Sequence, residues 1–223
     1  MTEPRNTDFT TCPATVPLDA EDQARADLYG LIGSFLLGPP DVGLLAVLAR
    51  ADPLSVDPHA APASPLDRAW ENLRIAATVM DERALKDEYA ALFISTGTPL
   101  LNPYESLYIA GHMMEKPLAK LRDELRALGL ARRAGAFELE DHLGSLCETM
   151  RILITEARPL ELQHAFFEHH IASWYARFLR DMRSAPGANF TRHLADFADA
   201  FFAIEAEAFG MEMDHDIAEG ARS

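Results

Sequence analysis

Apolar residues recur three or four positions apart along most of the chain, a spacing typical of amphipathic helices. In the segment 138–156, for example, Leu139, Leu143 and Leu146 would lie on one helix face. No segment between turn signals alternates apolar and polar residues in the way that a half-buried strand requires. The sequence therefore predicts an all-α fold.

Proline and glycine residues divide the chain into about eight or nine helices, which we expect to pack as a single globular, bundle-like domain. The predicted helices begin near residues 19, 41, 64, 81, 104, 138, 159 and 189. We expect the helix from 104 to be kinked or restarted at Pro117, and the last helix to end at Gly210. The domain would cover residues 19–210, between a disordered leader at 1–18 and a polar C-terminal tail at 211–223.

The charge balance limits the kinds of partner. The 223 residues include 35 acidic and 20 basic side chains, which gives a formal net charge of −15. Such a surface repels nucleic acid and anionic membranes, so we expect no nucleic-acid partner and no stable membrane association. It would attract a basic partner, such as an arginine-bearing peptide, although a net charge of this size can also serve solubility alone.

The sequence also predicts a cytoplasmic location. Cys12 and Cys147 lack C-x-x-C partners, which suits a reducing compartment and argues against a zinc site or redox pair. Residues 1–18 are polar and do not follow the pattern of a secretory signal. No apolar run approaches the ~18 residues of a membrane span.

Two short segments concentrate polar and aromatic side chains. The first, 95–108, is a loop that re-enters a helix at Tyr104, and it is either a structural connector or a functional loop. The second, 138–142, would place Glu138 and His142 on one helix face. Its acidic residues either stabilise a helix N-terminus or form a polar hot spot, in which Asp141 would accept hydrogen bonds from a guanidinium.

Enzyme classes find little support in the sequence. The pairs Glu161/His164 and Glu212/His215 match the E-x-x-H spacing of di-metal carboxylate bundles, but two further helical glutamate ligands are not evident. Adjacent histidines at 169–170 are interpreted as interface or boundary residues. Nucleophile motifs, phosphate-binding loops and dinucleotide fingerprints are absent from the sequence. We therefore expect no catalytic residue, no cofactor and no metal.

Four segments in order resemble the TorD family, the chaperones that escort molybdenum-enzyme subunits before export. They are 25–40, 88–108, 138–150 and 166–178, within a resemblance that covers about residues 20–210. The chain departs from the family pattern at Leu139 and Ser173, where the family often has proline.

The resemblance implies an all-helical, non-enzymatic chaperone. Its expected partners are an apo molybdoenzyme catalytic subunit and its twin-arginine leader peptide, with the machinery that supplies molybdopterin as a further partner. A helical adaptor without a molybdoenzyme client, or a di-metal oxidase, is the alternative. By resemblance, the residues expected to bind the leader or the client are Pro103, Tyr104, Glu105, Ser106, Tyr108, Glu138, Asp141 and His142.

We expect four of these residues to lie close together and to form one side of a groove for a basic, partly apolar leader peptide. Leu100 and Leu101 would be exposed on the loop and would contact the apolar stretch of that peptide. The four residues are Tyr104, Glu105, Asp141 and His142.

Overall fold

The computed structural model describes residues 18–54, 64–94, 97–131 and 138–220, with side chains described as far as residue 210. Within these ranges the chain forms ten α-helices, one short π-helix and no strand, which confirms the all-α prediction. The elements are α1 (Ala20–Leu37), α2 (Val42–Arg50), α3 (Pro65–Val79), α4 (Glu82–Phe93), α5 (Glu105–Ala110), α6 (Lys116–Ala127), α7 (Leu143–Thr155), α8 (Leu160–Phe167), η1 (Glu168–Ala172), α9 (Tyr175–Ser184) and α10 (Phe190–Gly220). None of the helices in the described ranges combines the length and apolar character of a membrane span.

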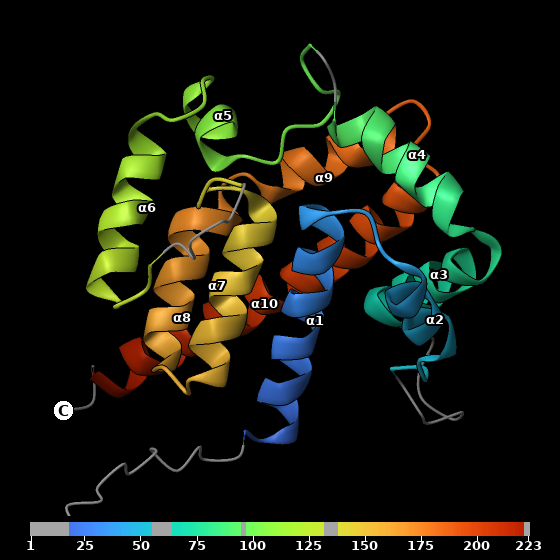
Figure 1. Ribbon diagram of the computed structural model, residues 1–223. Helices are drawn as coiled ribbons and strands as arrows, with labels where there is room; N and C mark the ends of the chain where they lie inside the picture. Colours follow the sequence, from blue (N-terminus) through green and yellow to red (C-terminus); the bar gives the residue numbers. More distant parts are fainter. Residues whose placement is uncertain (1–17, 55–63, 95–96, 132–137, 221–223) are drawn as a thin grey trace, which may run out of the picture.

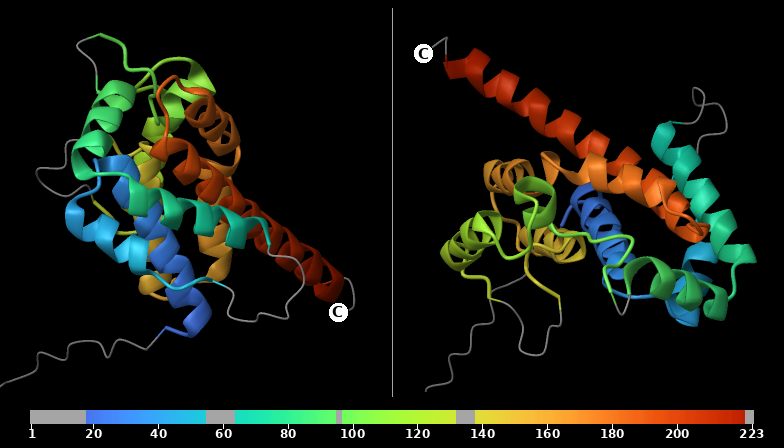
Figure 2. Two further views of the ribbon diagram at one scale, coloured as in Figure 1. Left: turned by 90° about the vertical axis from the view of Figure 1, so that its right-hand side faces the viewer. Right: turned by 90° about the horizontal axis from the view of Figure 1, so that it is seen from above.

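The helices form two groups joined by α10. The first group contains α1 and α7, which pack closely side by side, with α8 beside α7 and with α5 and α6 at the outer edge (Figure 1). The second group contains α2, α3 and α4 at the opposite edge. The long helix α10 packs against α3 and α9 and extends across the molecule, so it connects the two groups (Figure 2).

Four helices begin close to their predicted starts, each with a capping residue. Asp19, Asp41 and Asp81 each accept a hydrogen bond from a backbone N–H in the first turn of the helix that follows. Ser64 and the carboxylate three residues later form a reciprocal capping box, with Pro65 at the first helical position. These local signals act before any tertiary contact, which is why the sequence locates these boundaries well.

The core is rich in aromatic side chains from α10. The ring of Phe201 packs edge-on against Tyr29 of α1, with centroids 4.9 Å apart. On the other group of helices, Phe197 packs against Trp70 of α3 at 5.3 Å. Helix α10 therefore supplies buried surface to both groups, and the apolar faces predicted from the sequence meet along it.

The helix predicted from residue 138 begins instead at Leu143. Residues up to Asp141 form a turn, and His142 is the N-cap of α7. The reason is tertiary pairing. The backbones of Tyr104 and His142 form an isolated antiparallel bridge, which holds His142 in an extended conformation. Glu138 and His142 therefore do not share a helix face, and that part of the prediction is wrong.

The helix predicted over 104–128 is two helices. α5 runs from Glu105 to Ala110, and its C-cap is Gly111, whose φ of 81° is in the left-handed region that glycine adopts readily. The chain then turns and restarts as α6 at Lys116, with Pro117 in its first turn, so the restart at proline is confirmed.

Two further boundaries differ from prediction. The segment from 159 is interrupted by the π-helix η1, which separates α8 from α9. The last helix does not stop at Gly210 but runs to Gly220. A single glycine inside a helix costs only about 1 kcal/mol, so it does not by itself end one.

Candidate client-binding site

The start of α5 and the turn before α7 are joined by backbone hydrogen bonds. The Glu105 N–H donates to the Asp141 carbonyl at 2.9 Å, and the Leu143 N–H donates to the Pro103 carbonyl at 2.8 Å. These bonds bring together two segments that lie more than thirty residues apart in the sequence. The expected proximity of the two polar segments is therefore present in the structure.

Asp141 is fully buried, with 0% of its surface exposed. Its Oδ2 accepts hydrogen bonds from the Ser106 backbone N–H at 3.1 Å and from the Ser106 hydroxyl at 2.5 Å. Among the described residues, no donor reaches Asp141 Oδ1. Asp141 thus stabilises the first turn of α5, where a carboxylate also interacts favourably with the helix dipole.

His142 is buried and neutral at physiological pH. Its Nδ1 accepts a hydrogen bond from the Gly144 N–H at 3.0 Å, which requires an unprotonated nitrogen. Burial lowers the pKa of His142 to about 4, against the opposing charges of Glu138 and Asp141. The ring also packs edge-on against Tyr104, with centroids 5.1 Å apart.

Tyr104 and Glu138 form the partly exposed side of the site. The Tyr104 hydroxyl donates to Glu138 Oε2, and both residues are partly open to solvent. Burial of the ring and the Glu138 carboxylate raise the pKa of Tyr104, so its hydroxyl remains protonated. This pair presents an aromatic face and a carboxylate at the surface.

Tyr108 lies in α5, four residues after Tyr104, and is also partly exposed. Its ring stacks on Trp174 with centroids 5.3 Å apart, and its hydroxyl donates to Asp181 at 2.7 Å. The Arg177 guanidinium lies 5.7 Å from the centre of the Tyr108 ring and donates to the Tyr108 carbonyl. This part of the site therefore already holds one arginine by ring stacking.

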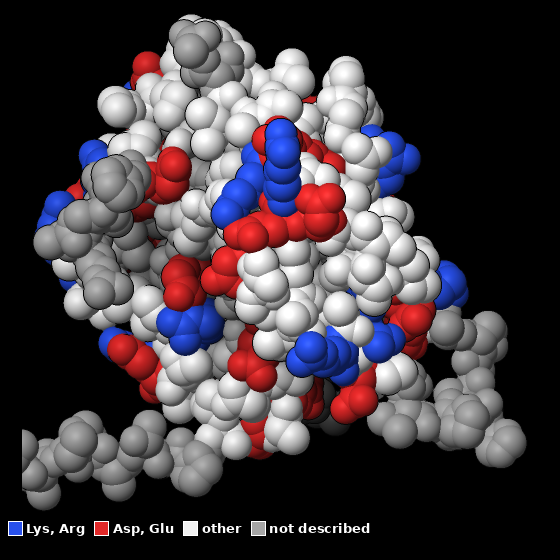
Figure 3. Space-filling model, turned by 45° about the vertical axis from the view of Figure 1, so that its right-hand side comes forward, with Lys and Arg blue, Asp and Glu red and all other residues white. Residues whose placement is uncertain are grey.

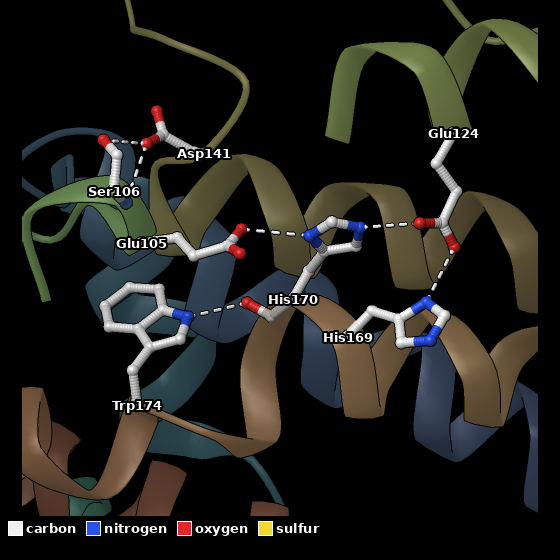
Figure 4. A network of polar contacts seen from close by, with 7 residues as sticks. All are labelled: Glu105, Ser106, Glu124, Asp141, His169, His170 and Trp174. Atoms are coloured by element: carbon white, nitrogen blue, oxygen red, sulfur yellow. Dashed lines mark hydrogen bonds and ion pairs between the residues drawn. The ribbon is translucent and has the colours of Figure 1, made fainter. Parts of the chain in front are cut away.

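Glu105 belongs to a second network of polar contacts, which was not predicted from the sequence (Figure 4). Glu105 is only 4% exposed, and its Oε2 lies 3.0 Å from Nδ1 of the fully buried His170. The other ring nitrogen, Nε2, lies 2.9 Å from Oε2 of Glu124, whose Oε1 lies 3.3 Å from Nδ1 of His169. Helices α5 and α6 and the π-helix thus meet at one buried imidazole.

The charges in this network favour a protonated His170. Burial acts to lower the pKa of His170, but the hydrogen bonds and charges of Glu105 and Glu124 outweigh it, so the pKa is raised. For Glu124, partial burial is outweighed by the two histidines, and its pKa is lowered. Trp174 Nε1 donates to the His170 carbonyl at 2.6 Å and fixes the π-helix against α9.

The structure brings the eight predicted residues into one region but buries five of them. Glu105, Ser106, Asp141 and His142 form an internal cluster, and Pro103 is buried beside them. Three of the four residues expected to form one side of a groove, Glu105, Asp141 and His142, are therefore buried, and three of the eight predicted residues are partly exposed. They are Tyr104, Tyr108 and Glu138.

The prediction for the loop leucines is half right. Leu100 is 60% exposed, but Leu101 is only 3% exposed and belongs to the core. The Leu101 N–H donates to the Leu92 carbonyl at 2.9 Å, which ties the loop to the end of α4 and turns this side chain inward.

The E-x-x-H pairs do not assemble in the described part of the chain. His164 stacks on Phe209 with centroids 5.1 Å apart, and Glu161 is exposed. The side chains of Glu212 and His215 lie outside the described residues. The di-metal arrangement considered from the sequence thus has no support from the first pair.

Comparison with solved structures supports the fold. A crystal structure from Archaeoglobus fulgidus, of a protein described only as a candidate redox enzyme maturation protein, superposes with a TM-score of 0.51 at 19% identity. The match covers 83% of this chain and 98% of that one. No curated protein matches the sequence.

The sequence comparison identifies the family. Residues 59–180, which include both polar segments of the site, match the family described as the nitrate reductase delta subunit. This span covers more than half of the 223 residues, and the resemblance to TorD-type proteins is confirmed. The chain therefore belongs to the nitrate reductase delta subunit family, the NarJ/TorD family of redox enzyme maturation proteins.

Proposed function

We propose that the protein is a non-enzymatic chaperone that binds an apo molybdoenzyme catalytic subunit, through its twin-arginine leader, its folded body or both, before the subunit leaves the cytoplasm. The observation that carries this proposal is the family match over residues 59–180. Both polar segments that resemble the TorD signature fall inside that match, so the site is built from the part of the chain that defines the family.

The surface that a peptide can reach is the site rim, formed by Tyr104, Tyr108 and Glu138. Each of these side chains is partly exposed. Tyr104 and Glu138 offer an aromatic ring and a carboxylate, whereas the Tyr108 ring already contacts Trp174 and Arg177. Aromatic rings beside carboxylates hold arginine by stacking and by charge-assisted hydrogen bonds. The position of Arg177 against Tyr108 supports the idea that a guanidinium fits this rim.

The buried cluster below the rim positions it. Ser106 and Asp141 join α5 to the turn before α7, and His142 packs against the Tyr104 ring. We propose that these residues act by holding the rim in place. Asp141 Oδ1, which accepts no hydrogen bond from the described residues, would accept one from a ligand group that reaches into the turn. Their substitution would then weaken binding and stability together.

Exposed apolar side chains adjoin the rim along the chain and suit the apolar stretch of a leader. They lie in the loop before α5, in α5 itself and in the turn after it. Clusters of such residues on a surface are typical of protein-binding sites. They are Leu100 at 60% exposed, Ile109 at 47%, Met113 at 40% and Met114 at 69%.

The overall charge favours a basic ligand. The net charge is −15, and acidic side chains are spread over the face shown in Figure 3, next to the basic ones. Such a surface accelerates the encounter with an arginine-bearing peptide, and the effect weakens as salt is added.

The proposal is tested by calorimetric titration of a twin-arginine leader peptide from a molybdoenzyme subunit of the same organism. Glu138→Gln and Tyr104→Leu should each weaken binding by about fivefold, which corresponds to about 1 kcal/mol for a partly exposed contact. The loss should be larger at low salt than at high salt for Glu138→Gln, because only that change removes a charge.

Two controls make the titration specific. Glu156→Gln removes an exposed carboxylate at the far end of α7 and should leave the affinity unchanged at high salt. A peptide with lysines in place of both arginines should bind more weakly, since lysine lacks the planar fork that a carboxylate and ring can hold. Equal binding of both peptides, or wild-type affinity of both rim variants, would show that the leader does not bind here.

A further inference from the structure

We propose that Glu124, His169 and His170 form a binding site for one divalent transition-metal ion, with zinc as the representative ion, and that Glu105 orients His170 within it. This site goes beyond the proposed chaperone function, since neither client recognition nor the site rim requires a metal. The ligands come from α6 and from the π-helix η1.

The donor atoms already converge. One nitrogen from each histidine and one carboxylate oxygen of Glu124 all lie within 4.8 Å of one another. The two oxygens of Glu124 already contact one ring each, with His170 Nε2 2.9 Å from Oε2 and His169 Nδ1 3.3 Å from Oε1. Ligand atoms of a tetrahedral zinc ion, each about 2.0–2.2 Å from the metal, are about 3.3 Å apart, so only a small rotation is needed.

Figure 4 shows that both imidazole rings are directed at the Glu124 carboxylate from the same side of the π-helix. Consecutive residues in a regular α-helix point about 100° apart, which normally prevents two neighbours from sharing one ligand. The wider π-turn changes this spacing, and such turns often occur at functional sites. The two histidines therefore lie on a stretch of irregular helix, Glu168–Ala172.

The buried partner of His170 matches the outer shell of a metal site. Metal-bound histidines almost always donate their second ring N–H to a carboxylate or carbonyl, which fixes the tautomer and the ring. Here Glu105 Oε2 lies 3.0 Å from His170 Nδ1, and both residues are buried. With Nδ1–H donating to Glu105, the Nε2 lone pair points at Glu124 and is available to an ion.

Each ring nitrogen of His170 faces a carboxylate, Glu105 at Nδ1 and Glu124 at Nε2. A neutral imidazole donates from only one nitrogen, so it cannot satisfy carboxylates at both. Either a second proton or a metal ion at Nε2 resolves this, and a metal ion could also take the His169 nitrogen that now contacts Glu124. The set of two imidazoles and one carboxylate suits zinc and its neighbours rather than calcium or magnesium, which prefer oxygen ligands.

The exposure of two ligands allows an ion to reach the site, and the number of ligands leaves a coordination position open. The side chains of His169 and Glu124 are 47% and 26% exposed, so an ion can enter without unfolding the core. Three protein ligands leave at least one position of a tetrahedral ion for water or for a side chain of a bound partner. The ion would also clamp the edge helix α6 to the centre of the fold.

The test is calorimetric titration of zinc into the full-length protein after treatment with a chelator, together with cobalt as a spectroscopic probe. We expect one site per chain, with visible cobalt bands of a tetrahedral centre that lack thiolate charge transfer, which separates this site from Cys12. Glu124→Gln and His169→Ala should each weaken binding by at least about tenfold, as should the outer-shell change Glu105→Gln.

A matched control lies one residue away. Asp123→Asn removes a 76% exposed carboxylate from the same helix, and it should bind zinc as wild type does. Circular dichroism of Glu124→Gln and His169→Ala should match wild type, since both positions are partly exposed. Wild-type affinity in both variants, or no binding at micromolar zinc, would overturn the proposal, whatever the result of the leader titration.

Discussion

His142 caps α7 with a ring nitrogen, whereas helix N-caps are usually serine, threonine, aspartate or asparagine. Its Nδ1 accepts the Gly144 N–H, so the cap works only while the imidazole is neutral. Burial lowers the pKa of His142 to about 4, below the ordinary value of 6.5. The hydrogen bond from the Gly144 N–H to His142 therefore forms at neutral pH and is lost in acid.

The first prediction concerns acid sensitivity. Because the His142 pKa is lower in the folded state, the unfolded chain binds the proton more readily, and stability falls as pH drops from about 6.5 to about 4. The loss is at most about 3 kcal/mol. His142→Asn keeps an N-cap acceptor that does not titrate, so denaturant unfolding at several pH values should show a flatter dependence.

His170 titrates in the opposite sense, and it is present in both the wild type and the His142→Asn variant. Its pKa is raised, so its contribution is complete in acid and is lost as pH rises through the folded value. His112→Asn, at an exposed position in the turn after α5, provides the control and should keep the wild-type pH profile. A wild-type slope in His142→Asn would mean that another group causes the acid loss.

The second prediction concerns Ser106. Its hydroxyl donates to the fully buried Asp141 carboxylate at 2.5 Å, so Ser106→Ala leaves a buried charge with one donor fewer. We expect a loss of about 1.5–3 kcal/mol in the free energy of unfolding, measured in urea. Ser184→Ala removes an exposed hydroxyl near the end of α9 and should change stability by less than about 0.5 kcal/mol.

At the scale of elements, the sequence predicts helix existence well and the boundaries near the site poorly. Asp81 caps α4 through a contact three residues away, so a local pattern is sufficient to locate that helix. The start of α7 depends instead on pairing between the segments of Tyr104 and His142, which no local pattern records. Helical periodicity therefore extended the prediction back to residue 138.

The same limit applies to the site. The two polar segments could be found because each concentrates unusual side chains in a short stretch. Glu124, by contrast, is one of many acidic residues on helices, and only the fold brings it to His170, 46 residues away in sequence. The adjacent histidines at 169–170 were the one available signal, but regular helix geometry would point them in different directions.

The third prediction concerns the contact between α1 and α7. A Cβ at Gly144 would lie 2.7 Å from Leu37 Cγ and 3.1 Å from the Gly33 carbonyl oxygen, so the two helices can approach only because the residue is small. Gly144→Ala should cost about 1–3 kcal/mol through overpacking. Gly210→Ala meets no neighbour within 4 Å in α10 and should stabilise by up to about 1 kcal/mol.

Chemical denaturation of both glycine variants separates packing from helix propensity, because the substitution is identical and the predicted signs are opposite. Stabilisation by Gly144→Ala would indicate that α1 and α7 can shift enough to admit the added methyl group and still pack together.

At the scale of the whole molecule, an ion pair joins the first and last helices. Arg25 of α1 donates to both carboxylate oxygens of Glu205 in α10, at 2.8 and 2.9 Å, and the Tyr29 hydroxyl donates to the same carboxylate at 3.0 Å. Glu205 is only 4% exposed in its side chain, so the pair is largely shielded from water. Since α10 packs with both helix groups, this contact bears on the whole fold.

The fourth prediction distinguishes the net contribution of this ion pair to the free energy of unfolding from the cost of removing one partner. Glu205→Ala leaves the buried Tyr29 hydroxyl without its acceptor and the partly buried Arg25 with Asp22 as its remaining partner, and it should destabilise by about 3 kcal/mol. The double variant Arg25→Met with Glu205→Leu should recover most of that loss, because an apolar pair avoids the cost of removing two charges from water. Asp196→Ala breaks a half-exposed pair with Arg183 and should cost about 1 kcal/mol or less. If Glu205→Ala were as mild as Asp196→Ala, apolar packing along α10 alone would hold the two ends of the chain together.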